Sequence, residues 1–289
     1  MNNNLAPIVI FCFKRIDLLK KLIKSLEKNP EHKHSTIYFF SDNFKDKKDE
    51  KEVQKVRNYI KNKISFKKKI IYFREKNYGL KKNILDGVEC VFKKYKKIIV
   101  LEDDLEISEN FLKTMNYFLK KYSNDRKIYT ITGYSFDFEK NILKEDFFLL
   151  KRPSSWGWAT WKNKWKNLKK KNSIKKIYHK YGNYLALMNI KNNKNNLNSW
   201  AFDWSINHIN KDKFCIYPKY SMIKNNGYDE YATNNLFKSK KLFTSIKNSK
   251  FKNYSVANES LEMKNLCKKN YDIKKIIYYL KLIYFKIFL

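Results

Sequence analysis

Three consecutive carboxylates, Glu102, Asp103 and Asp104, directly follow the apolar run at 97–101. Such a run of aliphatic and β-branched residues is typical of a central strand buried on both faces, and burial gives no reason for acids at its end. Open α/β sheets bind ligands at the carboxyl ends of their strands, and Mg²⁺ or Mn²⁺ shares its oxygen ligands between carboxylates and substrate phosphates. The triplet therefore indicates either a metal and phosphate site or a solvated acidic turn before a helix expected at 109–122.

The elements that must position these acids are predicted by alternating apolar patterns. Strand-like runs lie at 7–13, 36–41, 69–73, 97–101, 128–132 and 213–217, and helical stripes lie at 16–26 and 79–95. This alternation predicts an α/β fold with a mainly parallel sheet flanked by helices.

The pattern changes after about residue 145. Four tryptophans occur within ten positions: Trp156, Trp158, Trp161 and Trp165. A lysine-rich helical pattern and an Asn/Lys-rich loop at 189–198 follow, and a polar loop is expected at 221–235. We expect a helical and aromatic insertion on the substrate side of the sheet rather than another βαβ unit. The alternative is that the tryptophans fill a core.

The formal charge of +35 on 289 residues suggests binding to nucleic acid or an anionic surface. Only five of the 63 basic residues are arginines, however, and the lysines are spread along the chain. Base recognition favours arginine forks. We therefore expect no specific nucleic-acid partner and interpret most of the charge as compositional background.

Cysteines and histidines show no metal-ligand spacing. We expect reduced core cysteines at Cys12, Cys90, Cys215 and Cys267, and histidines without a catalytic role at His32, His34, His179 and His208. No apolar leader precedes the first strand, which favours a cytoplasmic location. The tail at 273–289 carries an apolar stripe beside lysines. It predicts an amphipathic helix that lies on an anionic membrane or docks on protein.

Six motifs occur in order across roughly 7–235. They are the strand at 7–13 that ends near Arg15, Ser41-Asp42, Glu102-Asp103-Asp104-Leu105, Trp156-Gly157-Trp158, Trp200-Ala201-Phe202-Asp203-Trp204 and Asn225-Asn226-Gly227-Tyr228-Asp229. Together they resemble bacterial glycosyltransferases of the GT-A fold, of the family 2 type. Their order is similar to that of the N-acetylglucosaminyltransferase I family.

The resemblance implies roles for the strand-end residues. Asp104 would coordinate Mn²⁺ or Mg²⁺, Asp103 would lie near the ribose or a metal-bound water, and Glu102 would approach the donor sugar. Arg15 and Asp42 would hold the nucleotide, with Asp42 against a uracil base.

It also implies a donor pocket and a catalytic base. The pocket residues would be Gly79, Lys82, Asn83, Trp156, Gly157, Trp158, Asn225 and Asp229. Asn234 stands near the place where related enzymes carry a histidine. Asp203 aligns with the base of the family, although Phe202 replaces the acid before it. An apolar setting between Phe202 and Trp204 would raise the basicity of Asp203; the alternative is an N-cap or a helix salt bridge.

The expected protein is an inverting, metal-dependent glycosyltransferase that uses a nucleotide-diphosphate sugar, with UDP as the expected nucleotide. The acceptor would be a glycan or a lipid-linked glycan of a surface polysaccharide, reached from the inner face of the membrane. We expect the catalytic domain at 1–245, with a nucleotide-sugar half at 1–135 and an acceptor half at 136–245, and a tail at 246–289. The alternatives are a nucleic-acid-binding protein and a sugar nucleotidyltransferase, although 11–16 lacks the glycines usual in the latter.

Overall fold

The structure is a computed structural model, which describes residues 5–165, 199–227 and 253–259 together with the single residues 246, 251 and 265. Several predicted features lie outside the described residues. They are the loop at 189–198, the helix at 273–289, and Asp229, Asn234, His179 and Cys267.

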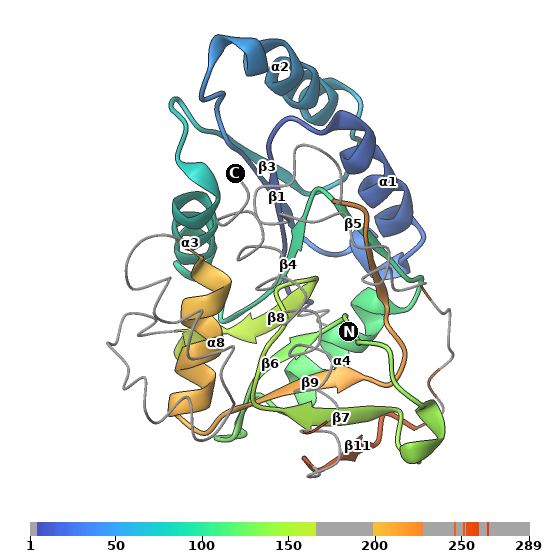
Figure 1. Cartoon of the computed structure of the whole chain (residues 1–289). Coiled ribbons are helices and arrows are strands. Elements are labelled where there is room, and N and C mark those ends of the chain that lie inside the picture. Colours follow the sequence, from blue (N-terminus) through green and yellow to red (C-terminus); the bar gives the residue numbers. More distant parts are fainter. Residues whose placement is uncertain are drawn as a thin grey trace, which may run out of the picture.

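A nine-stranded sheet forms the centre of the described chain (Figure 1). Its order is β11 (Val256–Ala257), β7 (Phe147–Leu150), β9 (Phe214–Pro218), β6 (Ile128–Thr132), β8 (Trp158–Trp161), β4 (Lys97–Glu102), β1 (Ile8–Cys12), β2 (Ile37–Ser41) and β3 (Lys69–Phe73). The four strands β4, β1, β2 and β3 are parallel, and β8 runs antiparallel to both β4 and β6. The prediction of a mainly parallel α/β sheet is confirmed.

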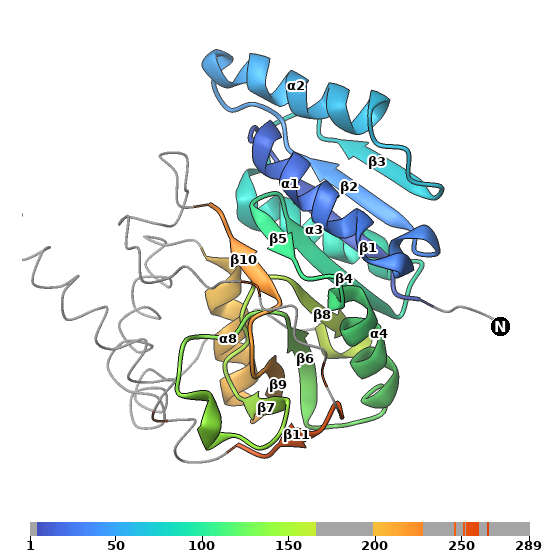
Figure 2. The same cartoon turned by 90° about the vertical axis from the view of Figure 1, so that its right-hand side faces the viewer.

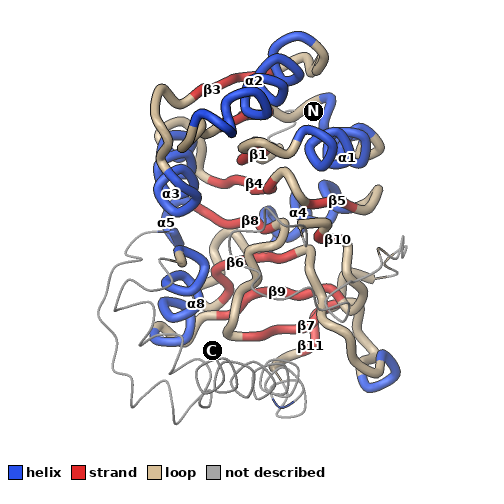
Figure 3. Tube along the Cα trace, turned by 45° about the horizontal axis from the view of Figure 1, so that its top comes forward, coloured by secondary structure: helices blue, strands red, loops and turns tan. Residues whose placement is uncertain are grey.

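Helices cover both faces of this sheet, as Figures 2 and 3 show. One face carries α1 (Ile16–Glu27), α2 (Lys47–Asn62) and α4 (Phe111–Lys121), and the other carries α3 (Gly79–Phe92), α5 (Lys162–Trp165) and α8 (Trp200–Asn210). Side chains of β1 alternate between the two resulting cores: Ile8 and Ile10 face α1, whereas Val9 and Phe11 face α3. This period of two is why a run that is apolar throughout forms a strand buried on both faces.

The tryptophan segment forms a central strand instead of the expected substrate-side insertion. Strand β8 inserts between β4 and β6, and all four of its residues are buried. Its sequence, Trp-Ala-Thr-Trp, consists mainly of aromatic and β-branched residues, which pack well on a pleated surface. The prediction for 158–161 was therefore wrong, and the alternative of tryptophans in a core describes this strand.

A second, two-stranded sheet lies beside α1, as Figure 2 shows. In it β5 (Leu105–Ile107) pairs antiparallel with β10 (Ile223–Asn225), with Leu105 opposite Asn225. The polar loop expected at 221–235 thus begins with a strand. This pairing brings 225–227 to the acidic triplet, more than a hundred residues earlier in the chain.

The described cysteines agree with the prediction of reduced core residues. Cys12 and Cys215 are buried, Cys90 is half-buried, and all three are free thiols. Within the described ranges, no helix is long and apolar enough to cross a membrane. The central sheet takes strands from both sides of residue 135. The division of 1–245 into two halves stays a prediction.

Candidate active site

The carboxyl ends of β1, β2 and β4 lie at one edge of the sheet. Cys12 pairs with Ser41, and Phe11 pairs with Glu102. Backbone hydrogen bonds continue past the strands, because the N–H of Asp42 donates to Cys12 O at 3.0 Å and that of Asp103 donates to Phe11 O at 3.0 Å. Asp42 and Asp103 therefore follow the two strands on either side of the end of β1, at the edge where open α/β sheets bind ligands.

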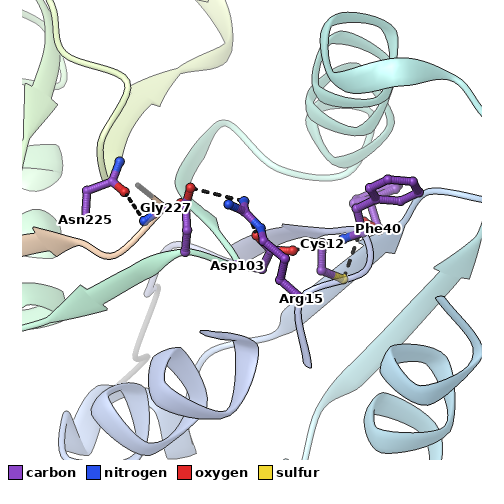
Figure 4. A network of polar contacts seen from close by, with 8 residues as sticks. Cys12, Arg15, Phe40, Asp103, Asn225 and Gly227 are labelled. Carbon is purple, nitrogen blue, oxygen red and sulfur yellow. Dashed lines mark hydrogen bonds and ion pairs between the residues drawn. The ribbon is translucent and has the colours of Figure 1, made fainter. Parts of the chain in front are cut away.

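Arg15 binds two of the three consecutive acids, and Figure 4 shows its guanidinium directed at Asp103. Its Nη2 lies 2.8 Å from Asp103 Oδ1 and 3.1 Å from Asp104 Oδ2. Asp103 is also fixed from β1, because its Oδ2 accepts the Phe13 N–H at 3.0 Å. The side chain of Asp103 is only 4% exposed, so these bonds hold a buried carboxylate in one orientation.

The segment after β10 contacts the same acids from the other side (Figure 4). The Asn226 N–H donates to Asp104 O at 2.8 Å, and Asn225 Oδ1 accepts the Gly227 N–H at 2.7 Å. A Cβ on Gly227 would lie 2.1 Å from Asp104 Oδ2. Only glycine therefore allows the backbone to approach the Asp104 carboxylate this closely.

The crowding of these acids raises two pKa values. The pKa of Glu102 is raised to about 8, first by burial and then by the charges of Asp104 and Asp103. Burial likewise raises the pKa of Asp104 to about 6, while Arg15 lowers it and Asp103 raises it. Three ionised carboxylates are thus unfavourable here without further positive charge.

Asp42 caps the start of α3. Its Oδ1 accepts the N–H groups of Asn43 at 2.9 Å and Tyr78 at 2.8 Å, and its Oδ2 accepts that of Gly79 at 2.9 Å. Three N–H donors on one buried carboxylate explain how the turn before α3 is fixed, with Gly79 at φ +69°. The structure thus gives Asp42 a structural partner where the sequence suggested a uracil base.

Other predicted pocket residues at the start of α3 also have partners within the protein. Asn83 is buried, and its Oδ1 accepts from Arg74 Nε at 2.9 Å. The Arg74 guanidinium lies 5.0 Å from the Phe40 ring and 4.6 Å from the Tyr78 ring. The Lys82 ammonium lies 4.5 Å from the same Tyr78 ring. Arg74, which sequence reasoning missed, therefore orders this turn by cation–π stacking.

Asp203 forms an ion pair with Lys81, which the sequence did not single out. Lys81 Nζ, in the first turn of α3, lies 2.9 Å from Asp203 Oδ2 in the first turn of α8. The Asp203 side chain is 33% exposed, although Phe202 and Trp204 beside it are buried. The prediction of an apolar setting for Asp203 was wrong. The alternative, a salt bridge, applies, and this salt bridge joins α3 and α8.

The three residues of the Trp-Gly-Trp motif have different surroundings. Trp158 is 0% exposed and packs against Trp165, Trp200 and Trp204, with ring centroids 4.6 to 5.5 Å away. It therefore has no surface for a sugar in this structure. Trp156 is half-buried with its ring 4.7 Å from that of Tyr134. Gly157 adopts φ +57°, and a Cβ there would meet Ile223, so its glycine serves packing.

His208 is a buried structural residue. Its Nδ1 lies 2.9 Å from Trp204 O and its Nε2 lies 3.0 Å from Thr130 Oγ1. Since a carbonyl only accepts, Nδ1 carries the proton and Nε2 accepts from the threonine. Burial lowers the pKa of His208 to about 4, so the ring stays neutral and gives no sign of a catalytic role.

The donor set at the triplet fits a divalent cation that is shared with a substrate. Among the described residues, no group of three or more His, Cys, Asp or Glu side chains is arranged to hold a metal ion. Asp103 and Asp104 supply two adjacent carboxylates, and the Gly227 backbone closes against one of them. Mg²⁺ and Mn²⁺ are commonly held by one or two carboxylates plus phosphate oxygens, so these residues fit such an ion.

Parallel strands that end in acids at one edge, with helices on both faces, define an α/β protein with a candidate ligand site at the ends of its strands. The family model described as "Glycosyl transferase family 2" matches residues 8–195. The chain belongs to this family, which places it among the glycosyltransferases.

Two solved structures show weak similarity. One is the mannosyltransferase PcManGT from Pyrobaculum calidifontis, in complex with GDP-Man and Mn²⁺, at 5% identity and a TM-score of 0.36 over 55% of this chain and 45% of that one. The other is TarS from S. aureus, at 17% identity and a TM-score of 0.32 over 44% of this chain and 21% of that one. The match thus spans less than half the length of either relative. No curated protein matches the chain.

Proposed function

We propose that this protein is an inverting, metal-dependent glycosyltransferase that transfers a sugar from a nucleotide-diphosphate donor, with UDP as the nucleotide. One observation carries the proposal: Arg15, Asp103 and Asp104 meet at the carboxyl end of β4, directly beside the end of β1. Membership of glycosyl transferase family 2 supports the reaction class.

Arg15 and Asp104 lie 3.1 Å apart, and in this proposal they separate so that the diphosphate of the donor binds Arg15 on one side and a cation on Asp104 on the other. Arg15 provides a planar guanidinium fork, which suits phosphate oxygens. Mn²⁺ or Mg²⁺ held on Asp104 would neutralise the charge that develops on the leaving diphosphate. Asp103 keeps its orientation through the Phe13 N–H on its Oδ2.

Asp203 would take the proton of the acceptor hydroxyl as this attacks the anomeric carbon opposite the diphosphate. Asp203 is a weaker base while Lys81 is ion-paired with it. In this proposal Lys81 therefore leaves Asp203 before the transfer and either turns away or binds the donor. Both side chains are partly exposed, which leaves room for this rearrangement. Lys81 is therefore a positioning residue for the proposed base.

The acceptor would be a glycan or a lipid-linked glycan. The basic tail at 273–289 could hold the enzyme near a lipid-linked acceptor at the inner face of the membrane. Deleting 273–289 should then lower the membrane-associated fraction in a vesicle flotation assay. An unchanged fraction would favour a helix that docks on protein.

A donor screen tests the proposal. UDP-, GDP- and CMP-sugars are incubated with the protein and Mn²⁺, and release of the nucleotide is measured for wild type, Asp104→Ala and Asp203→Asn. We expect one donor class to be turned over, Asp104→Ala to lose the metal-dependent turnover, and Asp203→Asn to keep donor binding while losing transfer. Glu52→Gln, which removes an exposed charge paired with Lys55 on α2, serves as the control.

Full metal-dependent activity in Asp104→Ala would remove the metal site from the triplet. Loss of donor binding in Asp203→Asn would move Asp203 into the donor pocket. The family match favours transfer over the two alternatives, a sugar nucleotidyltransferase and a nucleic-acid-binding protein. The latter would show binding to RNA or DNA that falls steeply with salt.

A further inference from the structure

One nitrogen of Arg15 faces two carboxylates at once. Nη2 lies 2.8 Å from Asp103 Oδ1 and 3.1 Å from Asp104 Oδ2. It thus bridges oxygens of adjacent residues as a bound cation would. The Arg15 side chain is mostly buried, so solvent screens this interaction only partly.

The two carboxylates differ in how they are held without Arg15. Asp103 would keep the Phe13 N–H on its Oδ2. Asp104 is confined by Gly227, which packs against its Oδ2, and by the Asn226 N–H on its backbone oxygen. Departure of the guanidinium would therefore leave both carboxylates in place, and one oxygen of each would lose its bond to Arg15.

A divalent ion that bridges Asp103 Oδ1 and Asp104 Oδ2 would take the place of Arg15 Nη2. The guanidinium cannot lose its proton, and two cations a few ångströms apart repel each other. Arg15 must therefore move away before a metal ion binds there. The phosphate oxygens of a nucleoside diphosphate can then accept hydrogen bonds from the displaced guanidinium of Arg15.

We infer that Arg15 is an internal stand-in cation for the Asp103–Asp104 pair, which keeps divalent metal binding weak until a nucleoside diphosphate accepts the displaced guanidinium. This inference rests on the proposed function and adds that metal and nucleotide bind cooperatively through one residue. Lys14 does not share this role. Its ammonium pairs with Asp49 of α2 at 2.8 Å.

The test measures free Mn²⁺ by electron paramagnetic resonance in titrations of wild type, Arg15→Met, Arg15→Lys and Lys14→Met, each with and without UDP, GDP, CDP or ADP at constant ionic strength. We expect wild type to bind Mn²⁺ at least about tenfold more tightly with one of these nucleotides, within the usual range of coupling between sites. Arg15→Met should bind Mn²⁺ at least about tenfold more tightly than wild type when no nucleotide is present, and should gain little from nucleotide.

Lys14→Met removes one positive charge from the neighbouring position and should behave as wild type, and Arg15→Lys, which keeps a charge, should stay closer to wild type than Arg15→Met. The inference is overturned if Arg15→Met, without nucleotide, binds Mn²⁺ no more tightly than wild type does. In that case the proposed function stays intact as long as nucleotide still strengthens Mn²⁺ binding in wild type. If no variant binds Mn²⁺ with or without nucleotide, the metal-dependent function fails together with the inference.

Discussion

Replacement of Gly227 by alanine is a steric test of the Asp104 site. The new Cβ would lie 2.1 Å from Asp104 Oδ2 and 2.9 Å from its Cγ, whereas contacts below 3.0 Å essentially never occur for a real Cβ. The carboxylate must therefore turn by about 1 Å, which also breaks its 3.1 Å bond to Arg15. Loss of a residue that orients a metal ligand costs about 10- to 100-fold in metal affinity. We expect Gly227→Ala to weaken metal-dependent nucleotide binding by a similar factor.

The backbone at Gly227 does not have a positive φ, so alanine adds no backbone strain there. The overlap with Asp104 should lower the free energy of unfolding by about 1–3 kcal/mol, which leaves a variant that can still fold. Calorimetric titration with UDP and Mn²⁺, with GDP in parallel, measures the affinity, and urea unfolding measures the stability. Asn226→Ala is the matched control, because that side chain reaches Glu106 at 3.5 Å while its backbone N–H stays on Asp104. Wild-type affinity in a stable Gly227→Ala variant would refute the proposed role of Asp104.

Three further changes test other parts of the site. Asp42→Asn should lower the free energy of unfolding by about 1–3 kcal/mol in urea, because at least one N–H donor at the start of α3 loses a charged acceptor; unchanged stability would contradict the capping role. Lys81→Met should slow sugar transfer while changing stability by less than about 1 kcal/mol, since the pair with Asp203 is partly exposed; Lys55→Met, which replaces an exposed lysine of α2, is the control, and equal transfer rates in both would remove Lys81 from the mechanism. In metal-free buffer the raised pKa of Glu102 means that protonated Glu102 contributes stability, which is present below about pH 4.5 and is lost as pH rises through 8. Glu102→Gln should therefore raise the melting temperature relative to wild type at pH 9, and much less at pH 5.

The sheet could be predicted from the sequence because its strands are locally encoded. The apolar runs at β1, β2, β3 and β4 each appear as a strand within one or two residues of the predicted bounds. The position of the triplet at a strand end followed from the same pattern. A continuous apolar run is sufficient evidence for such elements, because β1, β2 and β4 are buried on both faces.

The partners of the site residues could not be predicted, because they depend on contacts between distant segments. Lys81 meets Asp203 across 122 residues, and Gly227 reaches Asp104 only through the antiparallel pairing of β5 with β10. Trp158 was misplaced for a related reason. Its aromatic neighbours gave the same local signal as a sugar-binding platform, and only the insertion of β8 between β4 and β6 distinguishes a core strand from a surface.

Nucleotide binding at the strand ends is tested most directly by calorimetry of UDP, GDP, CDP and ADP in Mn²⁺ at 0.15 M salt, a physiological ionic strength, with wild type and Asp104→Ala. We expect one nucleoside diphosphate to bind in a 1:1 complex that requires Mn²⁺, and we expect Asp104→Ala to weaken it by at least about 100-fold. If no nucleotide binds, or if Asp104→Ala binds as tightly as wild type, the assignment of this site is contradicted.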